Sequence, residues 1–249
     1  MTVVDIQVWQ WVLLAFAAFL MGFSKTAIGG TVLLVIPMFA SVFGGKLSTG
    51  VMLPMLLLGD FYAVRIYYKH ANLKTVFELL PHTIVGILSG AWIGNRLNDH
   101  QFFIMIGLTM LICVIILSFN EFKKPGTKVA YHKWLPVLIG FACGFTSMIG
   151  NASAPIYGIY LLALGYEKNL FMGTSAIFFM LLNAMKMPFQ IFVWHNITWQ
   201  TLIFLPYLLV PLILGGLFGK WFLKKIDERV FRKLILLISA FAAVKMLLT

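Results

Sequence analysis

Long uninterrupted runs of apolar residues limit this chain to one class of structure. Six such runs lie at about 47–68, 75–95, 101–119, 169–194, 198–223 and 230–248. Each is long enough to cross the roughly 30 Å hydrocarbon layer of a bilayer as an α-helix. The runs are continuous and do not alternate with period two, which excludes a membrane β-barrel. The pattern therefore predicts an all-α polytopic membrane protein.

Composition and charge support this prediction and exclude several other classes. Of the 249 residues, 61% are hydrophobic and 11% are charged, whereas about a quarter of a soluble domain is charged. The net charge of +11 comes with no basic soluble region that could bind nucleic acid, so we interpret it as the positive-inside bias of a membrane protein. Cys113 and Cys143 lie in apolar runs without metal-ligand spacing. We expect no metal, no cofactor and no nucleic-acid partner.

Two further apolar regions, 8–43 and 134–165, are interrupted near their middle. The interruptions, at 22–30 and 144–153, are rich in glycine and small polar residues, and the first also contains Lys25. The apolar pieces on either side are only about 13–16 residues long. Such pieces are typical of half-helices in a re-entrant segment, and these residue types suit unwound backbone at membrane depth.

The chain repeats itself at a spacing of 122 to 128 residues, which predicts two related halves. We place the first repeat at 1–119, a polar linker at 120–133 and the second repeat at 134–249, all within one membrane domain. The matched positions are Gly22-Phe23-Ser24 with Gly144-Phe145-Thr146, Gly50 with Gly173, Asp60 with Asn183, His70 with His195, Leu80-Pro81 with Leu205-Pro206, Gly90 with Gly215, Gly94 with Gly219, Asp99 with Asp227, and Phe103 with Phe231. Internal duplication is common in secondary transporters.

The distribution of basic residues indicates the topology. If each broken segment is re-entrant, each half has three crossings and the second half is inverted relative to the first. With the linker in the cytoplasm, Lys46, Arg96 and Lys245 lie outside, and 14 lysines and arginines lie inside. If the broken segments cross, the same count is eight inside and nine outside. We therefore predict an inverted repeat with both termini outside. The 14 inside are Arg65, Lys69, Lys74, Lys123, Lys124, Lys128, Lys133, Lys168, Lys220, Lys224, Lys225, Arg229, Arg232 and Lys233.

Two broken helices in an inverted repeat should bring their breaks together near the midplane of the membrane. The half-helix after each break begins there, and its N-terminal end carries a partial positive charge suited to an anion. Lys25 would add a formal charge. The alternative is that the glycines serve helix packing and that Lys25 reaches a headgroup layer. The predicted binding residues are Gly22, Ser24, Lys25, Thr26, Thr146, Ser147, Gly150 and Asn151.

Two charged residues within the predicted crossings call for separate interpretations. Asp60 is the one acid well inside an apolar run, and intramembrane carboxylates are usually functional. It is our candidate coupling residue, with pairing to Lys25 or Arg65, or a structural bond to a nearby hydroxyl, as alternatives. Lys186 lies about 8 residues from the outer end of its run, so we expect its side chain to reach the membrane interface.

The residues around the breaks resemble a known family. Gly22-Phe23-Ser24-Lys25-Thr26 and its echo Gly144-Phe145-Thr146-Ser147-x-x-Gly150-Asn151-Ala152 are similar to the sulfite exporter TauE/SafE family. So are Gly59-Asp60, Tyr67-Tyr68-Lys69-His70 and the later glycines Gly86, Gly90 and Gly94. The resemblance implies a multi-pass protein of a bacterial or archaeal inner membrane that exports small anions such as sulfite or sulfoacetate. Thr31, Ser153 and Ala154 depart from the glycine-rich pattern, which bears on substrate identity more than on fold.

Two other classes of function stay open at this point. An anion channel would keep the same fold but contain a continuous pore. An intramembrane hydrolase or lipid transferase would need paired carboxylates or a Ser/His or Ser/Lys dyad. Ser24 and Lys25 are adjacent in sequence rather than facing, and one acid alone is deep. We therefore predict a transporter that acts on a small anion in the lipid bilayer, and not an enzyme.

Overall fold

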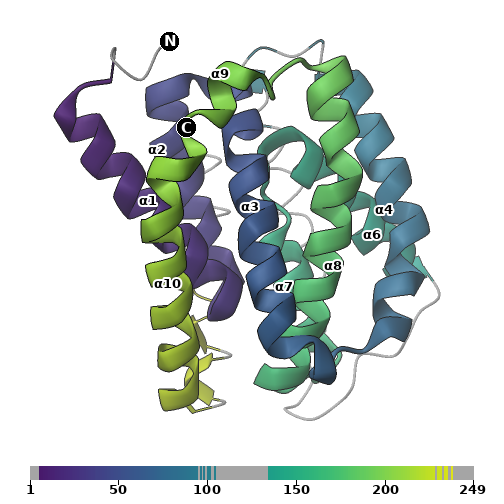
Figure 1. Ribbon diagram of the computed structural model, residues 1–249. Coiled ribbons are helices and arrows are strands. Elements are labelled where there is room, and N and C mark those ends of the chain that lie inside the picture. Colours follow the sequence, from purple (N-terminus) through teal and green to yellow (C-terminus); the bar gives the residue numbers. More distant parts are fainter. Residues whose placement is uncertain are drawn as a thin grey trace.

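All described secondary structure in the computed structural model is helical (Figure 1). The structure describes residues 6–94 and 134–227, with isolated positions at 96–104 and 229–237. The predicted linker 120–133 and most of the predicted crossings 101–119 and 230–248 lie outside these residues. The helices are α1 (Val8–Thr26), η2 (Gly29–Thr31), α2 (Val32–Phe43), α3 (Gly45–Tyr67), η3 (Tyr68–His70) and α4 (Leu73–Gly94), then α6 (Trp134–Gly150), α7 (Ala154–Ala163), α8 (Lys168–Pro188), the π-helical turn η4 (Phe189–Val193), α9 (Trp199–Leu202) and α10 (Leu205–Lys225).

Five of the described helices are long and apolar enough to span a membrane: Val8–Thr26, Lys46–His70, Leu73–Gly94, Lys168–Val193 and Leu205–Lys225. The last four correspond to the predicted crossings 47–68, 75–95, 169–194 and 198–223, except that the last begins with the separate helix α9. Large apolar side chains such as Phe77 and Trp92 of α4 and Tyr207 and Val210 of α10 are exposed on the surface. An apolar exterior of this kind faces lipid, so the prediction of a multi-pass membrane protein is confirmed.

The first broken segment forms a hairpin that enters and leaves on the same side. The rings of Trp11, near the start of α1, and Phe43, at the end of α2, lie 6.0 and 5.1 Å from the ring of Phe204, which precedes α10. At the tip, the Thr26 hydroxyl donates to the carbonyl of Gly216 at 2.8 Å. Helix α10 continues to Lys225, roughly 13 Å farther at about 1.5 Å per residue. The tip of the hairpin therefore lies part-way along α10, which is one of the candidate membrane-spanning helices.

The second broken segment is arranged in the same way against α4. Gly140 in α6 packs against the carbonyl of Leu79 near the start of α4. Tyr166, just after α7, bonds through its hydroxyl to Asn72 Nδ2 at 2.8 Å and to the Thr75 hydroxyl at 2.6 Å. The beginning of α6 and the end of α7 thus lie at the same end of α4. Both broken segments are therefore hairpins that return to the side from which they start, which is consistent with the predicted re-entrant segments.

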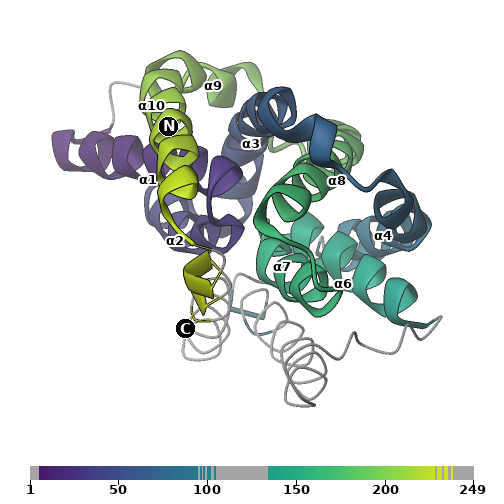
Figure 2. The ribbon, with the colours of Figure 1, turned by 90° about the horizontal axis from the view of Figure 1, so that it is seen from below.

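The contacts between the two halves are consistent with an inverted repeat. Helices α3 and α8 run antiparallel, because Gly50 packs against Asn196, Asp60 meets Asn183, and Gly173 packs against Tyr67. Gly50 and Gly173 are repeat mates, as are Asp60 and Asn183, so equivalent positions make equivalent contacts in opposite chain directions. Each hairpin packs on a helix of the other half, α1 on α10 and α6 on α4. Figure 2 shows α1, α2 and α10 together on one side of the molecule and α4, α6 and α7 together on the other.

One detail of the predicted breaks is wrong. Helix α1 has 19 residues and α6 has 17, so both helices continue through Gly22 and Gly144 and both exceed the predicted 13–16 residues. A Cβ atom on Gly22 would lie 1.9 Å from the carbonyl oxygen of Leu212 in α10, and one on Gly144 would lie 2.1 Å from that of Thr83 in α4. These glycines allow helices to approach closely and do not unwind the chain.

Surface labelling tests the orientation of this bundle. Arg65, Lys69 and Lys74 lie at the end that carries the loop between α3 and α4, and the positive-inside rule places this end in the cytoplasm. In a chain without Cys113 and Cys143, a membrane-impermeant maleimide applied to intact cells should label Gln200→Cys in α9 and spare Lys69→Cys and Lys128→Cys. The last two should react after the cells are opened. Labelling of Lys69→Cys in intact cells would reverse the assignment.

Candidate functional site

The two helix breaks meet in the interior of the bundle. The first consists of Ala27 and Ile28, followed by the turn η2, and the second is the stretch 151–153 between α6 and α7. Asn151 has a φ of 56°, a left-handed conformation that asparagine tolerates better than most residues. A Cβ atom on Gly29 would be in ordinary contact, at 3.8 Å, with that of Ala154 at the start of α7. The predicted meeting of the two breaks is therefore present.

A cavity with an empty volume of about 630 Å³, counting the space at its mouth, lies between the breaks and helices α3 and α8. One part of its wall is polar and another is apolar. The N-terminal ends of η2 and α7 both reach it, through Gly29, Gly30, Ser153 and Ala154. The other polar lining residues are Ser24, Lys25, Asp60, Ser147, Asn151, Ser175 and Asn183, and the other apolar ones are Val32, Leu56, Phe171, Met172, Ala176 and Phe179.

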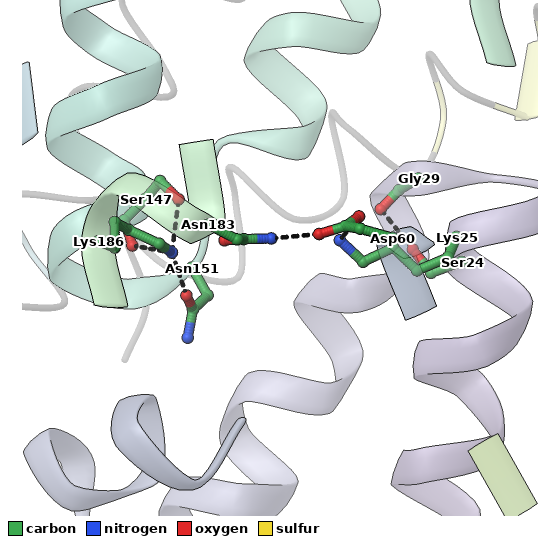
Figure 3. Close-up of polar contacts among 8 residues, drawn as sticks. All are labelled: Ser24, Lys25, Gly29, Asp60, Ser147, Asn151, Asn183 and Lys186. Carbon is green, nitrogen blue, oxygen red and sulfur yellow. Dashed lines mark hydrogen bonds and ion pairs between the residues drawn. The ribbon is translucent and has the colours of Figure 1, made fainter. Parts of the chain in front are cut away.

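A row of charged and polar groups crosses the centre of the bundle beside this cavity (Figure 3). The Lys25 ammonium contacts Asp60 Oδ1 at 2.6 Å, and Asn183 Nδ2 donates to Asp60 Oδ2 at 2.6 Å. The side chains of Lys25 and Asp60 are 10% and 1% exposed. Gly59 leaves room for the Lys25 stem, since a Cβ there would lie 2.9 Å from Lys25 Cγ. Of the two basic partners considered for Asp60, the structure therefore supports Lys25. Arg65 makes no ion pair among the described residues.

Lys186 corrects the sequence prediction. Its side chain does not reach the interface, because the residue is 1% exposed and lies inside the bundle. The ammonium donates to the Ser147 carbonyl at 3.0 Å, to the Ser147 hydroxyl at 2.8 Å and to Asn151 Oδ1 at 2.6 Å (Figure 3). The prediction was based on the position of Lys186 along its helix and did not consider the side of the helix on which Lys186 lies. Lys186 follows Asn183 by three residues, so both lie on the inward face of α8. The sequence match of Asn183 with Asp60 already indicated that this face points inward.

Among the described residues, Asn151 Nδ2 and Ser175 Oγ are buried polar atoms of cavity-lining residues that have no hydrogen-bond partner there. Buried polar groups are normally paired, because each unpaired one costs about 1–3 kcal/mol. An amide N–H and a hydroxyl can both donate to an anion. Ser175 was not among the predicted site residues, and nothing in its local sequence distinguishes it from other small residues of α8.

The predicted site residues divide into two groups. Ser24, Lys25, Ser147 and Asn151 line the cavity, and Ser24 also donates to the Gly29 carbonyl at 2.7 Å, which holds the first break in shape. The other predicted residues do not line it. Thr26 donates to Gly216, Thr146 donates to the Ala142 carbonyl, Gly22 faces α10, and Gly150 ends α6.

Within the described ranges no group of three His, Cys, Asp or Glu side chains is placed to hold a metal ion. The polar groups that converge on the cavity are ammonium, amide and hydroxyl groups with a single carboxylate, Asp60. Both oxygens of that carboxylate already accept hydrogen bonds. This arrangement of donors is suited to an anionic ligand.

Comparison with protein families agrees with this chemistry. The family model described as sulfite exporter TauE/SafE matches residues 14–246, nearly the whole chain. The chain belongs to the sulfite exporter TauE/SafE family. The resemblance drawn from the glycine-rich breaks is thereby confirmed, and this TauE/SafE protein is a member of a membrane transporter family. No curated protein and no solved structure matches it.

Double substitution tests whether Lys25 and Asp60 depend on each other in this TauE/SafE protein. Asp60→Leu should lower the Tm in detergent by several degrees, because it leaves the Lys25 ammonium without its carboxylate, and breaking a buried ion pair costs roughly 3–5 kcal/mol. The double variant Lys25→Met with Asp60→Leu should regain more than half of the loss. A double variant less stable than Asp60→Leu alone would show that the pair is not the source of the effect.

Proposed function

We propose that this protein is a secondary transporter of the inner membrane that exports a small anion, of the sulfite or sulfonate type, by alternating access. Its membership of the TauE/SafE family supports the anion class. The paired re-entrant hairpins support a carrier, because secondary transporters bind substrate where discontinuous helices meet near the midplane. The cytoplasmic linker and outward-facing termini are part of the same proposal and rest on the charge distribution.

The observation that carries the proposal is the cavity between the breaks. Lys25 lines it, the N-terminal ends of η2 and α7 reach it, and Asn151 Nδ2 and Ser175 Oγ are buried there without partners among the described residues. Because η2 continues directly into α2, the segment Gly29–Phe43 and helix α7 can each contribute up to about half a positive charge at the end that reaches the cavity. An oxyanion would accept hydrogen bonds from the free donors and lie beside the Lys25 ammonium.

Ligand-induced stabilisation tests the anion class. Sulfite, methanesulfonate, sulfoacetate and acetate are each added to purified protein, and the Tm is measured. A bound ligand stabilises the folded state by about 2.7 kcal/mol at a hundred times its Kd. At least one sulfur oxyanion should raise the Tm in a saturable way. In vesicles, counterflow of the same anion separates a carrier from a channel, and a lack of response to every anion would remove the proposal.

Substitution of Lys25 tests its part in the site. Lys25→Ala should weaken anion binding by about 1–3 kcal/mol, the range for a charge-assisted hydrogen bond, and Lys25→Gln should keep the fold and still lose affinity. Lys46→Ala is the matched control, because Lys46 lies at the far end of α3, over the ring of Trp194 at 5.4 Å. Wild-type affinity in both Lys25 variants would place the anion elsewhere.

Asp60 is our proposed coupling residue, because among the described residues that line the cavity it is the one with a carboxylate side chain. A proton on Asp60 would release its hold on Lys25 and free that ammonium for the anion. Asp60→Asn should flatten the pH dependence of transport while anion binding stays within about tenfold, roughly 1.4 kcal/mol. Transport is measured in vesicles over a range of pH. A pH profile equal to that of the wild type would exclude coupling through this residue.

A further inference from the structure

We infer that Lys186 is a positioning residue of the anion site, which acts through Asn151 and Ser147 and supplies the site with a second positive charge. This inference rests on the proposed anion cavity. Lys186 does not itself line the cavity, whereas both of the residues that it holds do. Its effect on a ligand would therefore be indirect.

The hydrogen bonds of Lys186 determine which atoms of Asn151 and Ser147 are left for a ligand. A lysine ammonium has three donors and no acceptor, and here all three bonds go to oxygens of these two residues. The amide of Asn151 must therefore turn Oδ1 toward Lys186, which leaves Nδ2 buried and unpartnered on the cavity wall. The Ser147 hydroxyl accepts from Lys186, so its own hydrogen is available to donate. The side chains of Asn151 and Ser147 can each donate or accept hydrogen bonds, and Lys186 occupies their acceptor oxygens. It therefore leaves both side chains as donors toward the cavity.

The charges around the cavity do not balance. The partners of the Lys186 ammonium are two neutral side chains and a carbonyl, and within the described residues it forms no ion pair with a carboxylate. Asp60 is already held by Lys25 and Asn183. With these groups ionised, Lys25, Asp60 and Lys186 together carry one excess positive charge. A buried ammonium is costly without a counter-ion, and an anion beside Asn151 would supply one through a polarised hydrogen bond.

The repeat explains why this charge arrives from another helix. Ser147 stands where the first half has Lys25, so the second break carries no ammonium of its own. Lys186 brings one to that place from α8. A purely structural role, in which Lys186 pins the end of α6 to α8, would use the same contacts. The two roles differ in what they predict for a ligand.

Two variants and a matched control separate these roles, with methanesulfonate as a probe whose charge does not change over the pH range used. Lys186→Met should weaken methanesulfonate binding at least tenfold. Lys168→Met is the control, because the Lys168 ammonium also donates to carbonyls, those of Leu223 and Ile226, but lies away from the cavity. It should bind methanesulfonate as the wild type does. A structural role alone would lower the Tm without ligand and leave the Kd unchanged.

Asn151→Asp keeps the test decisive if Lys186→Met fails to fold. Aspartate tolerates the left-handed backbone at this position, and its carboxylate would give Lys186 a counter-ion. The Tm without ligand should stay the same or rise, while methanesulfonate binding is lost with the Nδ2 donor and the net positive charge. Unchanged binding in Lys186→Met or in Asn151→Asp overturns the inference and leaves the proposed function intact. Failure of the wild type to bind any anion overturns both.

Discussion

Backbone that leaves the helical hydrogen-bonding pattern inside a bilayer must be enclosed by protein, and the arrangement of this molecule follows from that requirement. Around the second break, the amides of Asn151 and Ala152 donate to the carbonyls of Ser147 and Thr146. At the first, the Tyr67 hydroxyl donates to the Thr26 carbonyl at 2.9 Å. The two breaks also cover each other. Asn151 Nδ2 at the second break and Ser175 Oγ on α8 are buried without a partner among the described residues, and both residues line the cavity between the breaks. The space enclosed with the breaks is therefore also our proposed ligand site.

The enclosure depends on close packing between the halves. Glycines bring α1 against α10 and α6 against α4, and each pair joins a hairpin of one half to a crossing helix of the other. The molecule is thus divided into two groups of helices, each containing parts of both halves, with α3 and α8 between them. The ion pair connects Lys25 of one group to Asp60, and Lys186 connects α8 to the break of the other. In the proposed alternating-access mechanism, a relative movement of the two groups would change the shape of the cavity between them.

The sequence predicted those features of this structure that depend on local pattern. Apolar runs located α3, α4, α8 and α10, and the repeat paired Asp60 with Asn183. It did not predict that α1 runs through Gly22, because a glycine that unwinds a helix and one that admits a neighbour are the same residue in the sequence. What distinguishes them is the carbonyl of Leu212, which comes from the other half of the chain. Lys186 was assigned wrongly because only its depth along α8 was considered and not the face on which it lies. Its partners Ser147, in α6, and Asn151, in the break that follows, come from a distant part of the chain.

The charges at the centre show how a duplicated fold comes to contain a site that is not symmetric. The contacts of the two halves are consistent with a repeated backbone, and the predicted mates Asp60 and Asn183 meet between antiparallel helices. A site with full two-fold symmetry would contain two Lys–Asp pairs and be neutral. Here one carboxylate is replaced by the amide of Asn183, one lysine by Ser147, and Lys186 restores the second ammonium from α8. With both lysines protonated, two ammonium groups then accompany one carboxylate. The neutral amide of Asn183 donates to its mate Asp60 without adding a second negative charge, so in the proposed site the excess positive charge would be available to an anion.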